Sequence, residues 1–263
     1  MSADARPIAL VANDDGIGCL FLHELVAAVS TCFRVVVAAP AGEQSWIGRA
    51  FSRNRDVRVE ERAVPCALRA WAVHGTPADC VNIALGHLLG DERPDVVLSG
   101  INVGYNVSMP LGLSSGTLAA ATEGAAWGLR AAAFSLDLPQ EAFEHLRHHD
   151  GRAEGATLAA LRHAALRAAD FAQALLDQPP PRELVVHNYN FPFDCRADTP
   201  MARVQPADLR LRSLYERADD GTFRFRWNDG ENLTRHEHTD LSGLARGEIT
   251  HTVLNFSRLG REI

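Results

Sequence analysis

Two acidic side chains next to a short apolar run are the first residues in this sequence that suit chemistry. Asp14 and Asp15 follow the apolar run Pro7–Ala12, and Gly16 comes directly after them. Adjacent carboxylates repel a phosphate group unless a cation lies between them, and carboxylate oxygens bind hard cations such as Mg²⁺ and Mn²⁺. The pair therefore suggests a metal site, although on its own it more often marks a turn that ends a strand.

Three further loops carry hydroxyl or amide side chains that suit the same chemistry. Ser45 offers a hydroxyl ligand, and Asn102 and Asn106 offer amides that bind a metal or donate to a phosphoryl oxygen. Ser115 and Thr117 begin a helix-like stretch, where free N–H groups and the helix dipole attract anions. Each feature alone also fits an ordinary role, such as a solvated serine, an Asn/Gly turn or a helix cap.

The elements that must position these loops alternate between apolar runs and helix-like stretches. Such alternation predicts βαβ units and a parallel sheet, whose apolar strands are covered on both faces. The expected strands are Pro7–Ala12, Arg34–Ala38, Asp95–Ser99, Ala131–Ser135 and Glu183–Asn188, and the expected helices are Leu20–Thr31, Asp79–Leu89, Leu118–Trp127 and Ala156–Asp177. Because ligands bind at the carboxyl ends of the strands in open parallel sheets, we expect the four loops to meet in one cleft.

The remaining segments predict additions to this sheet. Alternation in Asp56–Glu61 and Ala70–Val73 favours a β-hairpin at the sheet edge. The polar stretch Gln140–Gly155 indicates an exposed insertion, and it contains His145, His148 and His149. Beyond Asp194 we expect strands at Ala202–Gln205, Leu209–Glu216, Thr222–Trp227 and Glu248–Phe256, with a short helix at His238–Arg246.

The fold class expected from these patterns is α/β. It is a Rossmann-like, doubly wound, mostly parallel sheet between two helix layers, with a C-terminal β-hairpin and helix extension. Residues 1–193 form the expected core, and residues 194–263 form the extension of the same structural domain. We expect this extension to serve in oligomerisation.

Composition and charge exclude several classes of protein. The chain has 263 residues, a formal net charge of -7 and no lysine, which argues against a nucleic-acid polymer as partner. Its five cysteines include no CxxC pair, which indicates free thiols in a reducing cytoplasm. The first residues do not form a signal peptide, and no run approaches the ~20 apolar residues of a membrane span. A cytoplasmic protein without a membrane partner is expected.

Two other kinds of α/β protein carry acidic residues after the first strand. A signalling receiver domain needs a lysine beside its phosphoryl group, and this chain has none. A calcium-dependent nucleoside hydrolase needs more carboxylates in its first loop than the two in Asn13–Gly16. Both alternatives therefore fit the sequence poorly.

Five segments of the chain stand in a recognisable order. They are Leu10–Gly16 (LVANDDG), Val36–Ser45 (VVAAPAGEQS), Gly75–Cys80 (GTPADC), Pro94–Asn106 (PDVVLSGINVGYN) and Ser115–Gly124 (SGTLAAATEG). The chain thereby resembles the SurE family of metal-dependent nucleotidases, also called survival protein SurE, and a weaker similarity covers Thr239–Phe256. The resemblance implies a Rossmann-like sheet and a 5'/3'-nucleotidase, which hydrolyses nucleoside 5'- or 3'-monophosphates as phosphate monoesters.

The resemblance also implies roles for particular residues. One divalent cation per subunit, Mg²⁺ or Mn²⁺, would be held by Asp14, Asp15, Ser45 and Asn102. The residues expected to act in catalysis are the two aspartates together with Asn106, Ser115 and Thr117, the last three by hydrogen bonds to the phosphate. The C-terminal extension would be exchanged between the subunits of a homodimer or homotetramer.

The residues after Ser45 depart from the pattern of this family. Trp46 stands where the family has a glycine, and Ala50 stands where it has a serine. The stretch between Asn106 and Ser115 also lacks the acidic residue expected there. The alternative function is therefore a non-catalytic module that binds a nucleotide or a metal.

Two mechanisms are compatible with these residues. In the first, the cation polarises the phosphoryl oxygens and activates a water molecule for in-line attack. In the second, Asp14 attacks and forms an aspartyl phosphate.

Overall fold

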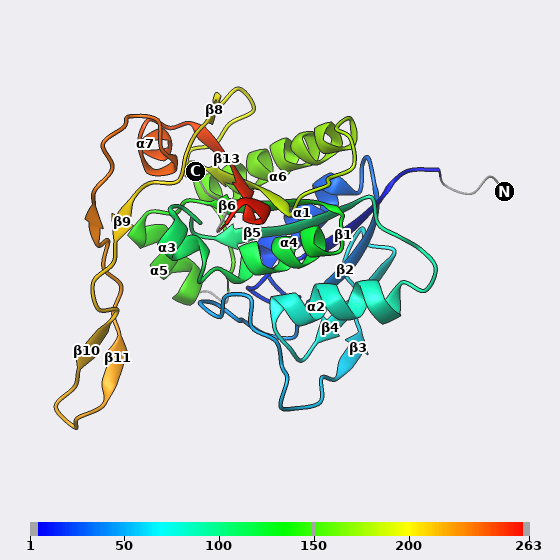
Figure 1. The fold of residues 1–263 in the computed structure, drawn as a ribbon, viewed down its shortest axis with the longest axis horizontal. Coiled ribbons are helices and arrows are strands. Elements are labelled where there is room, and N and C mark those ends of the chain that lie inside the picture. Colours follow the sequence, from blue (N-terminus) through cyan, green and yellow to red (C-terminus); the bar gives the residue numbers. More distant parts are fainter. Residues whose placement is uncertain (1–4, 149–150, 260–263) are drawn as a thin grey trace.

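The centre of the fold is a sheet of nine strands, seen in a computed structural model that describes residues 5–148 and 151–259 (Figure 1). The strand order is β3-β4-β2-β1-β5-β6-β7-β13-β8. The central strands run parallel to their neighbours, and they are β4 (Arg69–Val73), β2 (Arg34–Pro40), β1 (Ile8–Ala12), β5 (Val96–Val103), β6 (Arg130–Leu136) and β7 (Val185–Phe191). The expected doubly wound, mostly parallel sheet is confirmed.

Antiparallel strands close both edges of this sheet. At one edge β3 (Val59–Glu61) pairs with β4 in the antiparallel sense, which confirms the predicted edge hairpin. At the other edge β13 (Ile249–Asn255) runs antiparallel to β7, and β8 (Met201–Arg203) runs parallel to β13. Part of the expected C-terminal extension therefore lies in the main sheet.

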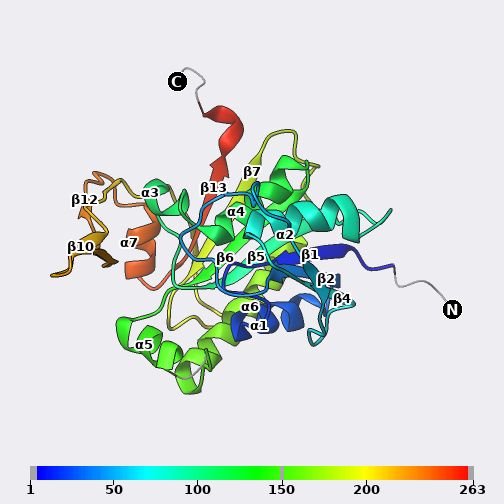
Figure 2. The same ribbon diagram turned by 90° about the horizontal axis from the view of Figure 1, so that it is seen from below.

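Helices cover both faces of the sheet (Figure 2). One layer contains α1 (Leu20–Val29) and α6 (Gly155–Leu176), and the other contains α2 (Pro77–Ile83) and α4 (Gly116–Ala126). Successive residues of β1 alternate between the two layers, so Ala9 and Val11 pack with α1 while Leu10 and Ala12 pack with α2. This double burial explains why the central strands are almost entirely apolar.

Shorter helical segments complete the chain. They are the π-helical turn Ala84–Leu88 after α2, then α3 (Met109–Gly112), α5 (Gln140–His148), α7 (Asp240–Ala245) and the 3₁₀ turn Phe256–Arg258. The predicted polar insertion forms α5, on which His145 and His148 are exposed. His149 lies outside the described residues.

The segment between β8 and α7 differs from its prediction. The expected single strand Leu209–Glu216 is wrong, because two short strands share it. The first, β9 (Leu209–Arg210), pairs with β12 (Glu231–Asn232), whereas β10 (Tyr215–Arg217) pairs with β11 (Phe223–Phe225). One run of alternating residues thus serves two separate ribbons, and the β10–β11 hairpin projects from the body in Figure 1.

The helix α7 is also shorter than its predicted range. It begins after Thr239, whose hydroxyl accepts a hydrogen bond from Ser242 N at 3.2 Å. This cap fixes the first residue of the helix at Asp240 rather than His238. Within the described ranges, no helix has the length and apolar character that crossing a lipid bilayer requires.

Candidate active site

The predicted site residues lie where the strand order of the sheet reverses. The neighbours of β1 are β2 on one side and β5 on the other, and the chain builds outward from β1 in both directions. Such a switch point leaves a crevice at the carboxyl ends of the two central strands. Asp14 and Asp15 follow β1, and Asn102 lies near the end of β5.

Asp14 is held against the beginning of α4. Its side chain is buried, and its Oδ1 accepts a hydrogen bond from Thr117 Oγ1 at 2.7 Å. A Cβ atom on Gly116 would lie 2.6 Å from the Cβ of Asp14, so only glycine lets the helix start so close. The positive end of the helix dipole there favours the charged carboxylate.

Asp15 lies beside β5. Its Oδ2 accepts a hydrogen bond from Val103 N at 3.2 Å, which joins the first loop to the loop that carries Asn102. Burial raises the pKa of Asp14 to about 6. Burial, and then the charge of Asp14, raise the pKa of Asp15 well above its ordinary value.

These pKa shifts have one physical meaning. Two desolvated carboxylates lie side by side, and no positive side chain among the described residues lowers the pKa of either, so their charged forms are unfavourable. A divalent cation between them would remove this cost, and the oxygen donors present suit Mg²⁺ or Mn²⁺. The residues therefore fit the cation that the sequence predicts.

No group of three or more His, Cys, Asp and Glu side chains that could hold a metal occurs in the described part of the chain. Hydroxyl and amide oxygens would have to complete the shell.

The loop after β2 contributes a third carboxylate. Gln44 N donates to Asp14 O at 2.7 Å, which brings the loop beside the acidic pair. Ser45 Oγ donates to Glu43 Oε1 at 2.8 Å. The charge of Glu43 also raises the pKa of Asp14 and Asp15. Sequence reasoning gave Glu43 no role, although its place two residues before a predicted ligand was a usable signal.

The amide residues of the β5 loop are fixed by different partners. Asn102 Nδ2 donates to Gly104 O at 2.7 Å. Asn106 N donates to Asn190 Oδ1 at 2.7 Å, and Asn106 O accepts from Asn188 Nδ2 at 2.8 Å. Both asparagines come from β7 and were missed by sequence reasoning. The signal was present, because they are polar side chains in the buried strand VVHNYNF.

The three residues predicted to contact the phosphate, Asn106, Ser115 and Thr117, form hydrogen bonds with other groups of the protein. Ser115 Oγ accepts from Leu118 N at 3.1 Å and thereby caps α4. Asn106 Nδ2 donates to Thr117 Oγ1 at 3.2 Å and to Ser135 Oγ at 2.9 Å. Thr117 is fully buried, and its one proton goes to Asp14. The structure thus makes Thr117 a positioning residue for Asp14, and phosphate contact by the three stays a prediction.

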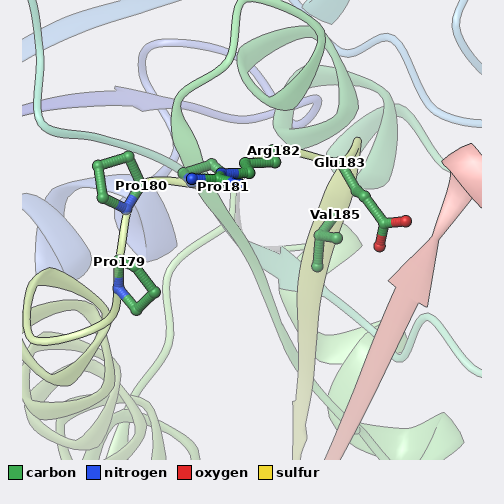
Figure 3. Close-up of a pocket in the computed structure, with 6 residues that line it drawn as sticks. All are labelled: Pro179, Pro180, Pro181, Arg182, Glu183 and Val185. Carbon is green, nitrogen blue, oxygen red and sulfur yellow. The ribbon is translucent and has the colours of Figure 1, made fainter.

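A shallow hollow elsewhere on the surface contains none of the predicted site residues (Figure 3). It is lined by Pro179, Pro180, Pro181, Arg182, Glu183 and Val185. These residues precede or begin β7, which is parallel to β6. The hollow therefore lies at the amino edge of the sheet, opposite the predicted cleft.

Comparison with known proteins gives matches over most of the chain. The family model described as survival protein SurE matches residues 9–214. A 5'-nucleotidase SurE of Cytophaga hutchinsonii is 33% identical over 250 residues, which cover 94% of this chain and 90% of that protein. A 5'-nucleotidase SurE of Myxococcus xanthus is 48% identical over 127 residues, which cover 48% of this chain and 47% of that protein. The crystal structure of a SurE protein from Aquifex aeolicus has the same fold, with a TM-score of 0.73, 24% identity, and coverage of 95% of this chain and 93% of that one.

Proposed function

The chain belongs to the survival protein SurE family, and from this premise we propose that it is a metal-dependent phosphatase of nucleoside monophosphates. Its relatives in Cytophaga hutchinsonii and Myxococcus xanthus carry the name 5'-nucleotidase. The observation that carries the proposal is the acidic pair at the switch point of the sheet, made of the buried Asp14 and the half-buried Asp15. A site of this kind needs a cation before it can accept a phosphate.

We propose one Mg²⁺ or Mn²⁺ per chain, with ligands from Asp14, Asp15, Ser45 and Asn102. When bound, such a cation supplies Lewis-acid polarisation of the phosphoryl oxygens and a more acidic water molecule. The Thr117 hydroxyl holds one oxygen of Asp14 by its hydrogen bond, which leaves the other oxygen for ligation. Asn102 donates one amide hydrogen to Gly104 O, so its carbonyl oxygen is the atom that suits a cation.

The neighbouring polar groups keep these ligands in place. Asn106 donates to Thr117, and Asn188 and Asn190 in turn hold the backbone of Asn106. This chain of hydrogen bonds runs from β7 to Asp14 across the width of two strands. A preorganised network of this kind costs no rearrangement when charge develops on the phosphate. Ser115 Oγ accepts the capping hydrogen bond from Leu118 N, so its own hydroxyl proton is the donor that we propose for the phosphate.

The finer parts of the proposal follow from the same reasoning. The substrate is a nucleoside 5'- or 3'-monophosphate or a similar small phosphate monoester, hydrolysed in the cytoplasm. The chain acts as a homodimer or homotetramer through residues 194–263. Support for this comes from the projecting hairpin, on which Tyr215 and Phe223 are 58% and 65% exposed. Sedimentation equilibrium tests the oligomer, since deletion of residues 213–228 would then yield a monomer.

The activity is tested by phosphate release from a panel of nucleoside monophosphates in Mg²⁺, Mn²⁺ or EDTA. We expect release that needs the cation and that falls at least 100-fold in Asp14→Asn, because one ligand is lost. Asp95→Asn is the matched control, since its carboxylate accepts from Ile8 N at the opposite edge of the sheet. Folded wild-type protein that releases no phosphate with either metal would favour the alternative, a non-catalytic binding module.

A further inference from the structure

An aromatic cluster stands on the loop that carries the proposed ligand Ser45. The centroid of the Trp46 ring lies 5.2 Å from that of Phe225 and 5.7 Å from that of Trp227. Phe225 and Trp227 come from the end of the β10–β11 hairpin, far from Trp46 in the sequence. We call Trp46, Phe225 and Trp227 the aromatic platform.

The platform lies beside the acidic pair because two backbone contacts anchor its loop. On one side of Trp46, Gln44 N donates to Asp14 O at 2.7 Å. On the other side, Gly48 N donates to Ser114 O at 2.9 Å, next to the cap of α4. Two residues of chain span at most about 7 Å, so the backbone of Trp46 lies within that distance of both anchors.

The hairpin side of the platform is also tied to the site. Leu211, which leads into the hairpin, and Tyr105 pack against the same cluster of buried residues, Val107, Leu111 and Leu244. Tyr105 stands between Asn102 and Asn106 in the β5 loop. Trp227 Nε1 donates to Asp229 Oδ1 at 3.0 Å, which fixes the indole. The platform thus lies between two loops that carry proposed ligands.

The rings of the platform keep much of their surface in solvent. Trp46, Phe225 and Trp227 are 43%, 48% and 39% exposed. Their planes meet at 57° and 54°, so the rings pack as tilted pairs and do not cover one another face to face. Partly exposed aromatic rings beside the proposed phosphate site offer a flat ligand a place to stack.

The backbone of Trp46 gives independent evidence that the indole is needed here. Its φ is 62°, in the left-handed region that favours glycine and that bulky residues rarely adopt. A glycine would take this conformation without strain, so the chain accepts strain in order to place an indole. Strain of this kind concentrates at functional sites, and Trp46 belongs to none of the apolar core clusters formed by the described residues.

We propose that the aromatic platform binds the base of the substrate by stacking, and that it favours purine nucleoside monophosphates over phosphate esters without a ring. This inference rests on the proposed function and names its substrate class. Stacking strength grows with the area of the ring system, so purines gain more than pyrimidines. The proposal also assigns a role to Trp46, the residue that departs from the family pattern.

The test compares Trp46→Gly with the wild type on two substrates, a purine nucleoside 5'-monophosphate and glycerol 2-phosphate. We expect KM for the nucleotide to rise roughly 5- to 150-fold, the range given by base–aromatic stacking, with kcat nearly unchanged. KM and kcat for glycerol 2-phosphate should stay at the wild-type values, which also shows that the variant folds. Trp46→Phe should recover most of the nucleotide KM, and Phe225→Ala should raise it.

A second measurement does not need catalysis. The phosphate-free purine nucleoside should quench the indole fluorescence of Asp14→Asn, and the added change Trp46→Gly should raise the nucleoside concentration for half-maximal quenching roughly 5- to 150-fold. Nucleotide hydrolysis with the same KM in Trp46→Gly and the wild type would overturn the platform while the proposed function stands. A variant that loses a subunit contact, with unchanged nucleotide KM, would overturn it in favour of an interface between copies. Absence of all hydrolysis with intact nucleoside quenching would overturn the proposed function alone.

Discussion

Replacement of Asp14 by asparagine should stabilise the metal-free protein at neutral pH. Asparagine keeps an oxygen that accepts from Thr117 Oγ1, so the change removes the buried charge with little loss of packing. Burial raises the pKa of Asp14 from 3.8 to about 6, which corresponds to about 3 kcal/mol at about 1.4 kcal/mol per pKa unit. The variant should therefore be more stable than the wild type by about 3 kcal/mol above pH 7 in EDTA.

The sign of the pH dependence follows from the direction of this shift. A carboxyl whose pKa is raised in the folded state favours folding when it is protonated. Its contribution is fully present below pH 3.8, the unfolded value, and is lost as the pH rises through about 6. The difference between the variant and the wild type should thus be near zero at pH 3.5 and should grow toward neutral pH.

Urea unfolding at a series of pH values in EDTA measures this difference, and repeating it with Mn²⁺ measures the effect of the cation. Mn²⁺ should stabilise the wild type and leave Asp14→Asn unchanged, because binding to the folded state adds to its stability. Asp95→Asn should respond to Mn²⁺ as the wild type does, since Asp95 lies before β5 and bonds Ile8 N. A variant that is less stable than the wild type at pH 7.5 in EDTA would refute the reasoning.

Three further predictions concern other contacts of the fold. Thr117→Val should lower kcat by about 10- to 100-fold, since it removes the hydrogen bond to the Asp14 carboxylate. Thr117→Ser keeps the hydroxyl and should keep most of the activity. Steady-state kinetics with a saturating cation measure both. Gly116→Ala should cost ~1–3 kcal/mol in urea unfolding, because its Cβ would lie 2.6 Å from the Cβ of Asp14. Gly18→Ala, which meets no atom within 4 Å, should be nearly neutral, and equal losses in the two variants would count against the close approach. Acid should destabilise the fold at the β7–β13 edge of the sheet, because burial lowers the pKa of His187 from 6.5 to about 4. This shift corresponds to about 3 kcal/mol of folding free energy at about 1.4 kcal/mol per pKa unit. The contribution is fully present above pH 6.5 and is lost as the pH falls through about 4. His187→Phe should flatten urea-unfolding stability in this window, and an unchanged slope would contradict the neutral pair that His187 Nδ1 forms with His251 Nε2 at 3.0 Å.

The central sheet was predictable because its strands follow simple rules. Runs such as Arg34–Ala38 are apolar throughout, since both faces of β2 are covered by helices. The edge hairpin of β3 and β4 was predictable from alternation alone. The segment from β9 to β12 was not, because its alternating residues pair with partners that local patterns do not identify.

Some features of the candidate site were also predictable from the sequence, and others were not. The position of Asp14 and Asp15 at the carboxyl edge of the sheet was predictable because they directly follow an apolar strand, and the pairing of β1 with β5 brings the loop of Asn102 beside them. The role of Thr117 as a donor to Asp14 was not, since it depends on the close approach of α4 that Gly116 permits. The partners of Trp46 were equally hidden, because Phe225 and Trp227 reach it from the distant hairpin.

The central claim is that Asp14 and Asp15 hold one catalytic cation. Equilibrium dialysis of the protein against Mn²⁺, with phosphate release from a nucleoside 5'-monophosphate measured on the same samples, tests it most directly. The account predicts one tightly bound Mn²⁺ per wild-type chain, activity proportional to occupancy, and loss of both in Asp14→Asn and Asp15→Asn. Full Mn²⁺ binding or full activity in either variant would contradict it.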